Sequence, residues 1–167
     1  GFGLVRVDLP QRDVGGDGGV RFRDVELAGW VYGAKHDDGS ELFDFDRCFI
    51  HDCATGILGN SRAKIRFTRG KITRYGVPGT NQYHAIYSKE GQSRHVEGSE
   101  FDEELGGGYC LHAWGEEATQ PEYDRIVSNY FGAGVGRAVI CNDSCVTELR
   151  GNVYRCTGAA VSTHCCA

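Results

Sequence analysis

The chain has 167 residues, enough for one domain with a substantial core, and 40% of them are hydrophobic, which excludes a disordered chain. The formal net charge is −5, from 18 basic and 23 acidic side chains, and no basic stripe interrupts the sequence, so nucleic acid is not expected as a partner. No apolar run approaches the roughly 18 residues that span a bilayer, which argues against a membrane protein.

The N-terminal residues 1–19 contain an alternating apolar stretch at 4–9, followed by a loop rich in Gly and Asp. We expect them to form a short cap or a degenerate first coil that covers the open strand edges of the following fold. No secretory signal peptide precedes this stretch, and the chain contains no Met. We therefore expect a processed chain or a piece of a longer protein.

From residue 20 onwards, apolar residues recur in pairs of anchors that stand five positions apart. The pairs are Phe22 and Leu27, Phe45 and Ile50, Phe67 and Ile72, Val96 and Phe101, Ile126 and Phe131, and Leu149 and Tyr154. A further apolar stretch follows each pair, at Val31, Ile57, Ile86, Leu111, Val139 and Val161. This makes six units of 22 to 30 residues. Units this short, each with several short apolar stretches, are typical of the coils of a β-solenoid rather than of helical repeats.

Each apolar stretch is expected to form a short strand that pairs in parallel with its equivalents in the coils above and below, at a spacing of about 4.8 Å. The sequence thus predicts an all-β, single-stranded parallel β-helix of about six coils over residues 20–163, with a tail at 164–167. Asn129 and Asn152 both lie three residues after a first anchor. We expect them to stack at one corner, amide over amide, and to satisfy backbone groups there.

The clearest copies of the repeat are Phe-Asp-Arg-Cys-Phe-Ile-His-Asp-Cys-Ala-Thr-Gly-Ile at 45–57 and Leu-Arg-Gly-Asn-Val-Tyr-Arg-Cys-Thr-Gly-Ala-Ala-Val at 149–161. They resemble the repeats of the right-handed parallel β-helix, or pectate-lyase-like, family, over residues 20–163. The resemblance implies a right-handed coil. Because the motif is structural, it indicates the fold far better than the activity. Members of the family often act on polysaccharides, and many are lyases of uronate-containing glycans.

The third and fourth units carry insertions, at 73–85 and after Leu111, and insertions in repeat proteins form loops on one face that often binds a ligand. The outward positions between these loops form a square on that face. Its members are Tyr87, Lys89, His112 and Trp114, flanked by Asn60 and Asn142. His84, at the start of the same strand, is expected either to contact a substrate or to cap a corner.

A lyase acting on an acidic glycan by β-elimination needs a base, a cation and an acid. The expected roles are Lys89 or His112 as the base, Tyr87 as the acid or hydrogen-bond donor, and Arg94 as the carboxylate clamp. Trp114, Asn60, His84 and Asn142 are the expected substrate-binding residues. The paired carboxylates of a glycoside hydrolase do not stand out.

Acidic residues of the two loops are candidate ligands for Ca²⁺, which takes several oxygen ligands. They are Asp102, Glu103, Glu104, Glu116 and Glu117. No other cofactor is indicated. The alternative to a lyase is a non-catalytic carbohydrate-binding or structural β-helix module of a larger secreted, surface or phage tailspike-like protein. The short length favours this alternative, and the chain is then expected to associate with copies of itself or to continue the solenoid of a parent chain.

Eight cysteines allow two main interpretations and a third, a metal site that includes His164, which is disfavoured because the spacing is not a standard zinc pattern. One or two disulfides would staple the C-terminal coils of a secreted or surface protein, a virion surface included. Alternatively, Cys48, Cys53, Cys110 and Cys141 are small buried hydrophobic residues.

Overall fold

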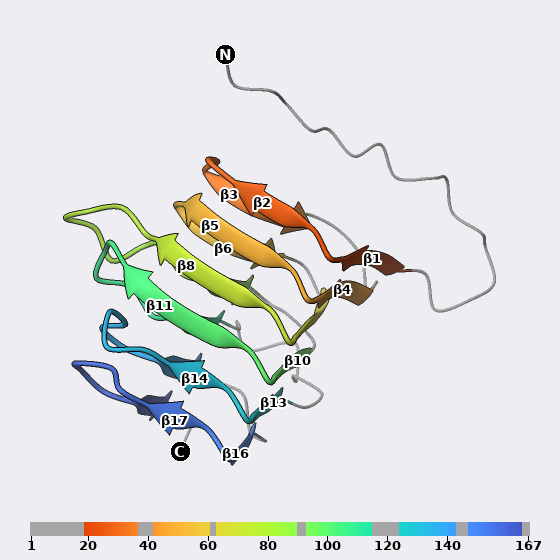
Figure 1. The fold of residues 1–167 in the computed structure, drawn as a ribbon. Helices are drawn as coiled ribbons and strands as arrows, with labels where there is room; N and C mark the ends of the chain where they lie inside the picture. Colours follow the sequence, from red (N-terminus) through yellow and green to blue (C-terminus); the bar gives the residue numbers. More distant parts are fainter. Residues whose placement is uncertain are drawn as a thin grey trace.

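The computed structural model describes residues 19–36, 42–60, 63–89, 93–114, 124–142 and 147–164. All regular elements in these ranges are β-strands, arranged as six stacked coils that each contribute one strand to each of three faces (Figure 1). The predicted all-β parallel solenoid of about six coils is therefore confirmed. In the described ranges no helix is long and apolar enough to cross a membrane. Residues 1–18 of the predicted cap at 1–19 and residues 165–167 of the predicted tail at 164–167 lie outside the described ranges, whereas Gly19 begins β1 and His164 ends β18.

Each of the three parallel sheets contains six strands. Sheet 1 consists of β1 (Gly19–Arg23), β4 (Leu42–Asp46), β7 (Lys64–Thr68), β10 (Ser93–Glu97), β13 (Asp124–Val127) and β16 (Thr147–Arg150). Sheet 2 consists of β2 (Glu26–Ala28), β5 (Phe49–Cys53), β8 (Lys71–Tyr75), β11 (Glu100–Glu104), β14 (Tyr130–Phe131) and β17 (Val153–Tyr154). Sheet 3 consists of β3 (Tyr32–His36), β6 (Thr55–Gly59), β9 (Ile86–Lys89), β12 (Leu111–Trp114), β15 (Val139–Asn142) and β18 (Val161–His164).

Strands of neighbouring coils pair in the register that the sequence repeat predicts. All six first anchors stand opposite one another along sheet 1, from Phe22 to Leu149. All six second anchors do the same along sheet 2, from Leu27 to Tyr154. Five of the six third positions align along sheet 3, from Ile57 to Val161.

Coil one is the exception, because Ala34 and not Val31 stands opposite Ile57. Val31 is 58% exposed. The sequence pattern selected the larger apolar residue, whereas the smaller Ala34 occupies the position opposite Ile57, and the neighbouring position, Gly33, has no room for a side chain. A Cβ atom added at Gly33 would lie 2.6 Å from Cγ2 of Ile50. The predicted third position of coil one was therefore wrong by three residues.

The anchors fill the interior with stacked side chains. Phe45, Phe67, Phe101 and Phe131 are fully buried. The rings of Phe101 and Phe131 stack with centroids 5.3 Å apart, and those of Phe131 and Tyr154 stack at 5.1 Å. Because each buried apolar side chain contributes about 1.5–3 kcal/mol, these aromatic anchors are a principal source of stability.

The first corner, where sheet 1 turns into sheet 2, has the same backbone conformation in every coil. The residue two positions after each first anchor has a φ between 53° and 65°. These residues are Asp24, Arg47, Arg69, Gly98, Ser128 and Gly151. This left-handed conformation is costly for most side chains, so its recurrence in four non-glycine residues shows that the stacked backbone imposes it.

The next position of the first corner carries the predicted asparagine ladder, which the structure confirms. Oδ1 of Asn129 accepts a hydrogen bond from the backbone N–H of Ser99 at 3.0 Å, and its Nδ2 donates to the carbonyl of Val96 at 2.9 Å. Asn152 repeats the arrangement one coil further on, where its Oδ1 accepts from the N–H of Asn129 at 2.9 Å. Backbone groups that a corner would leave unsatisfied are thus bonded inside it.

The four cysteines whose side chains are described carry free thiols, so the predicted disulfides are absent from this part of the chain. Cys48, Cys53 and Cys110 are buried. Burial raises the pKa of all three thiols, which keeps them protonated and unreactive. They serve as small core residues. The side chains of Cys141, Cys145, Cys165 and Cys166 lie outside the description.

Candidate functional site

The square predicted from the sequence lies on sheet 3, where β9 and β12 pair directly. Tyr87 stands opposite His112, and Lys89 opposite Trp114. The rings of Tyr87 and His112 stack with centroids 4.9 Å apart, and Trp114 meets His112 edge-on at 6.4 Å. The structure therefore brings the four residues together as expected.

His84 joins this cluster from the inside and is only 3% exposed. Its Nε2 lies 2.9 Å from Nδ1 of His112, and its Nδ1 lies 3.0 Å from both the backbone N and the carbonyl O of Tyr109. Its contacts are therefore those of a corner cap and not those of a residue presented to a substrate. Tyr109 packs against His112 in turn, and the guanidinium of Arg137 lies over its ring at 4.1 Å.

The two imidazoles are held in the neutral form. Burial lowers the pKa of His84 to about 4. Burial, followed by the charges of His84, Arg94 and Arg137, lowers the pKa of His112 to about 3. The Nε2 atom of His112 is buried and makes no hydrogen bond within the described part of the chain. A base this weak and this enclosed is poorly matched to proton abstraction near neutral pH.

Acid should therefore destabilise the protein through these two histidines. In the unfolded chain both histidines bind a proton below a pKa of about 6.5. In the folded chain they stay neutral until the pH falls to about 4 for His84 and about 3 for His112, so acid favours the unfolded state. The free energy of unfolding should fall by up to about 1.4 kcal/mol per pH unit for each histidine in this window. Urea denaturation between pH 7 and 4 measures the slope, and His112→Gln should flatten it.

His51 supplies the control, because its pKa is shifted in the opposite direction. Hydrogen bonds from its ring to Asp52 at 2.7 Å and Glu26 at 2.9 Å raise its pKa. The stability it contributes is complete below its unfolded-state pKa and is lost only as the pH rises through the folded value. His51→Gln should therefore change the profile above about pH 6.5 and leave the acid slope intact. Equal slopes in the wild type and His112→Gln would contradict the assignment.

Arg94 was expected to clamp a carboxylate on this face, and the structure contradicts that role. Its side chain is 1% exposed and lies inside the solenoid, in register with the core residue Ile65. Nη2 of Arg94 donates to Oδ2 of Asp124 at 2.6 Å, and its backbone N–H donates to Oδ1 at 3.0 Å. The guanidinium therefore neutralises a buried carboxylate and cannot reach a ligand on the surface.

The remaining residues of the predicted face occupy its margins. Lys89 is exposed, and Trp114 is 42% exposed. Asn60 follows β6, and its backbone N–H donates to the carbonyl of His36 at 2.8 Å. The backbone of Asn142 pairs with His164 in sheet 3, and its side chain lies outside the description.

Among the acidic residues proposed as Ca²⁺ ligands, Asp102 and Glu104 accept hydrogen bonds from backbone groups. Oδ1 of Asp102 accepts the backbone N–H of Gly134 at 2.8 Å, and Oε2 of Glu104 accepts that of Gly136 at 2.8 Å. Glu103 is exposed. In the described ranges no group of three or more His, Cys, Asp or Glu side chains is arranged to hold a metal. Glu116 and Glu117 lie outside these ranges.

A second candidate site, which the sequence reasoning missed, lies at the first corner. It is an open groove of about 460 Å³, called the corner groove here, that crosses the corners of coils two to five. Its lining includes three cations, Arg47, Arg69 and Lys71, and the ring of Tyr130, which is 42% exposed. Glu100 is the acidic residue of the lining, and its Oε1 lies 2.7 Å from Nζ of Lys71. The lining therefore carries a net charge of +2.

The corner groove exists because coil four has no side chain at its corner. A Cβ added at Gly98 would meet nothing within 4 Å except Cγ of Arg69 at 3.8 Å, so the space above this glycine is open. The floor is completed by Gly70 and by Ser99, which is 3% exposed. The glycine stands between the arginine of coil three and the serine of coil five at equivalent corner positions.

The sequence matches no protein-family model, no curated protein and no solved structure at a significant level. The resemblance to pectate-lyase-like repeats accordingly stays a prediction, while the solenoid fold rests on the strand pairing itself.

A signal for the corner groove was present in the sequence. The residues two positions after the first anchors include Arg47, Arg69 and Gly98. Sequence reasoning followed the neighbouring column, with its asparagines, and the outward residues of sheet 3. A glycine between bulky corner residues leaves a hollow, and Gly98 beside Arg69 is such a position.

Proposed function

We propose that this solenoid is a non-catalytic module that binds an acidic polysaccharide in the corner groove. The observation that carries the proposal is the lining itself, which combines three cations with an exposed aromatic ring. Carboxylates of a uronate chain would pair with Arg47, Arg69 and Lys71. The ring of Tyr130 offers a flat apolar surface to a sugar face. A secreted or surface location accompanies the proposal.

Binding is favoured over β-elimination because the groups needed for elimination are poorly placed. Arg94 is enclosed, and Nε2 of His112 is buried in a ring whose pKa is about 3. In the corner groove, the hydrogen bond to Glu100 raises the pKa of Lys71, so this amine stays protonated at neutral pH and is no base. Fixed cations support recognition of a polyanion, whereas the amine of Lys71 is not available as a base.

The test is the affinity of the protein for polygalacturonate and alginate fragments, measured by fluorescence anisotropy, with Gly98→Asp as the probe variant. The new carboxylate would lie in the corner groove beside Arg69 and repel a uronate chain. The backbone should accept it, because Asp24 has a φ of 55° at the equivalent corner position. We expect the dissociation constant to rise at least about tenfold, since juxtaposed like charges in an interface cost several kcal/mol.

Gly151→Asp is the matched control. Gly151 occupies the same corner position in coil six with a φ of 65° and does not line the corner groove. This variant should therefore bind like the wild type. Absence of binding to every acidic polymer, or equal weakening by both substitutions, would contradict the proposal. A rise in ultraviolet absorbance from unsaturated products would replace it with a lyase.

A further inference from the structure

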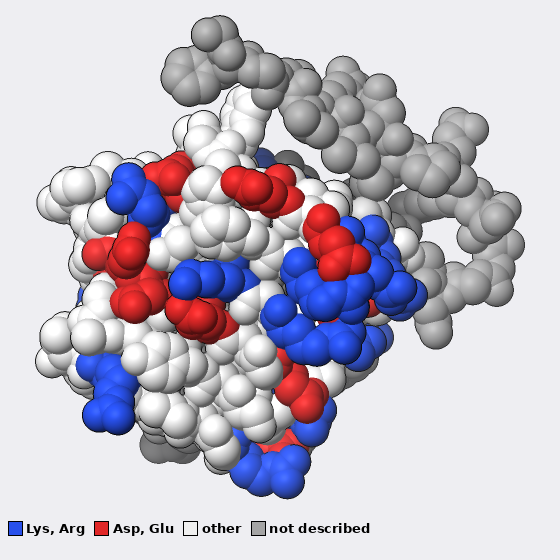
Figure 2. Space-filling view, viewed as in Figure 1, with Lys and Arg blue, Asp and Glu red and all other residues white. Residues whose placement is uncertain are grey.

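The outer face of sheet 1 and the adjoining first corner carry five arginines from coils one to three. They are Arg21, Arg23, Arg47, Arg66 and Arg69, and their side chains are 42 to 62% exposed. In Figure 2 the basic side chains gather over the edge of the solenoid at the level of β1 and β4. Together with Asp24, Asp44 and Asp46, they give this face a net charge of +2 in a chain whose overall charge is −5.

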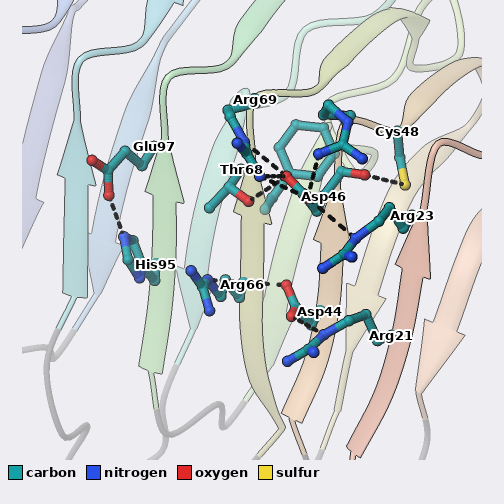
Figure 3. Close-up of polar contacts among 12 residues, drawn as sticks. Arg21, Arg23, Asp44, Asp46, Cys48, Arg66, Thr68, Arg69, His95 and Glu97 are labelled. Carbon is teal, nitrogen blue, oxygen red and sulfur yellow. Dashed lines mark hydrogen bonds and ion pairs between the residues drawn. The ribbon is translucent and has the colours of Figure 1, made fainter.

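Two buried carboxylates hold these guanidinium groups in place, together with the exposed Asp24, which accepts two hydrogen bonds from Arg47 at 2.6 Å. The side chains of Asp44 and Asp46 are only 5% and 7% exposed. Asp46 lies at the centre, with Arg69 at 2.6 Å, Arg47 at 3.0 Å and Arg23 at 3.4 Å from its oxygens. Figure 3 shows Arg23 and Arg69 approaching Asp46 from opposite sides. Three arginines from three successive coils, the arginine triad, therefore converge above one buried carboxylate.

The triad is pre-organised for an anion. A guanidinium carries five N–H donors, and the side chains of Arg23 and Arg69 are more than half exposed to solvent. Because Asp46 already restrains the side chains, a ligand would order few additional rotamers on binding. A carboxylate offers two oxygens, whereas a sulfate or phosphate ester offers three peripheral oxygens, one for each arginine.

We infer that the arginine triad binds a tetrahedral oxyanion, a sulfate or phosphate ester. The inference rests on the proposed function to the extent that the ester is carried by the acidic polysaccharide in the corner groove. Arg47 and Arg69 belong to both the triad and the corner groove, so a sugar chain lying in the groove would bring its substituents to the triad. The ligand is then a sulfated or phosphorylated acidic glycan, not a plain polyuronate.

A nucleic acid fits this face less well. The five arginines span three coils, roughly 10 Å along the solenoid axis at the usual strand spacing. Outside this face the chain carries the remaining charge of −7. A long polyanion would extend beyond the arginines over an acidic surface, whereas nucleic-acid binders neutralise phosphates along an extended footprint.

The first experiment compares chondroitin with chondroitin sulfate, which share the uronate and differ in the sulfate ester. The sulfated polymer should bind the wild type at least about tenfold more tightly, as expected for added charge-assisted hydrogen bonds. Arg23→Gln should abolish this preference and leave the affinity for chondroitin unchanged, because Arg23 does not line the corner groove. Arg23→Lys keeps the positive charge but loses the planar guanidinium that can donate two parallel hydrogen bonds, so it should retain only part of the preference.

Arg150→Gln is the matched control, because this substitution removes the same charge from the same sheet. Arg150 lies in β16 at the opposite end of the solenoid, and its side chain is 70% exposed. Its loss should leave the preference intact. A phosphomannan run in parallel shows whether a phosphate ester replaces the sulfate, and a short DNA duplex tests the nucleic-acid alternative. Tight Arg23-dependent binding of DNA without a preference for sulfated glycan would overturn the inference.

A second readout does not depend on the polysaccharide. Inorganic sulfate and phosphate should raise the melting temperature relative to chloride at equal ionic strength, and Arg23→Gln should remove the increase. If chondroitin binds in the corner groove but neither sulfation nor inorganic sulfate has an effect, the triad inference fails and the proposed function stands. If no glycan binds but sulfate stabilises the protein through Arg23, the proposed function fails and the triad stands as an oxyanion site.

Discussion

Replacing Arg94 with alanine is expected to lower the free energy of unfolding by about 3–5 kcal/mol. Arg94 and Asp124 are 1% and 3% exposed inside the solenoid, and their side chains meet at 2.6 Å. Without the guanidinium, the carboxylate of Asp124 would be left buried without its counter-charge. The cost is that of the stranded charge and not the net value of the pair, because forming the pair already required the desolvation of both groups.

A double substitution separates these two contributions. Arg94→Met combined with Asp124→Leu replaces the pair with apolar side chains of similar length, and should destabilise the protein much less than either Arg94→Ala or Asp124→Ala. Urea denaturation of the three variants provides the comparison. A loss below about 1 kcal/mol in Arg94→Ala would show that water reaches Asp124 and that the pair is not enclosed as described.

Asn129→Ala is expected to cost roughly 2–5 kcal/mol. The amide of Asn129 accepts the N–H of Ser99 and donates to the carbonyl of Val96, both inside the first corner. Its removal leaves two buried backbone groups without these partners, and each unsatisfied group costs about 1–3 kcal/mol. Thermal and urea unfolding measure the loss.

Asn152→Ala provides the graded comparison for the ladder. Asn152 serves the N–H of Asn129 and the carbonyl of Ile126 at the last described corner, where its side chain is only partly buried. Water should compensate for part of the loss there, so this variant should be the more stable of the two. The reverse order would show that the ladder is held from its C-terminal end.

The fold was predictable because one residue per strand carries the repeat. Spacing alone gave the correct partner for every anchor of sheets 1 and 2. It failed at Val31, where a small residue, Ala34, fills the inward position. The pattern ranks residues by apolarity, so it chose Val31 over the smaller Ala34.

The fate of Arg94 was also contained in the sequence. Side chains of a strand alternate between faces, so Arg94 must share the inward face of the anchor Val96 two residues later. The same parity places Asp124 on the face of Ile126. The prediction treated Arg94 as a surface cation because charge was weighed above alternation. Its buried partner could not be named without the register between coils.

The imidazole cluster shows that the spacing of the repeat does not predict which side chains are enclosed. Sequence placed Tyr87 beside His112 correctly, yet it could not show that His84 lies beneath them or that both imidazoles are enclosed. Enclosure depends on residues from several coils at once. The thiols illustrate the same limit, because cysteine spacing alone did not distinguish a disulfide from a buried core residue.

Because the backbone of the first corner is uniform, the residues that stabilise the solenoid are distinct from the corner side chains that a ligand would contact. Asp24, Arg47, Arg69 and Ser128 all adopt the conformation that glycine adopts in coils four and six. A chain of sugars lying along the axis would therefore meet one exchangeable corner position per coil, at a constant step of about 4.8 Å. The ligand preference would then depend on six corner positions in a row, and single substitutions at these positions would change it without altering the core.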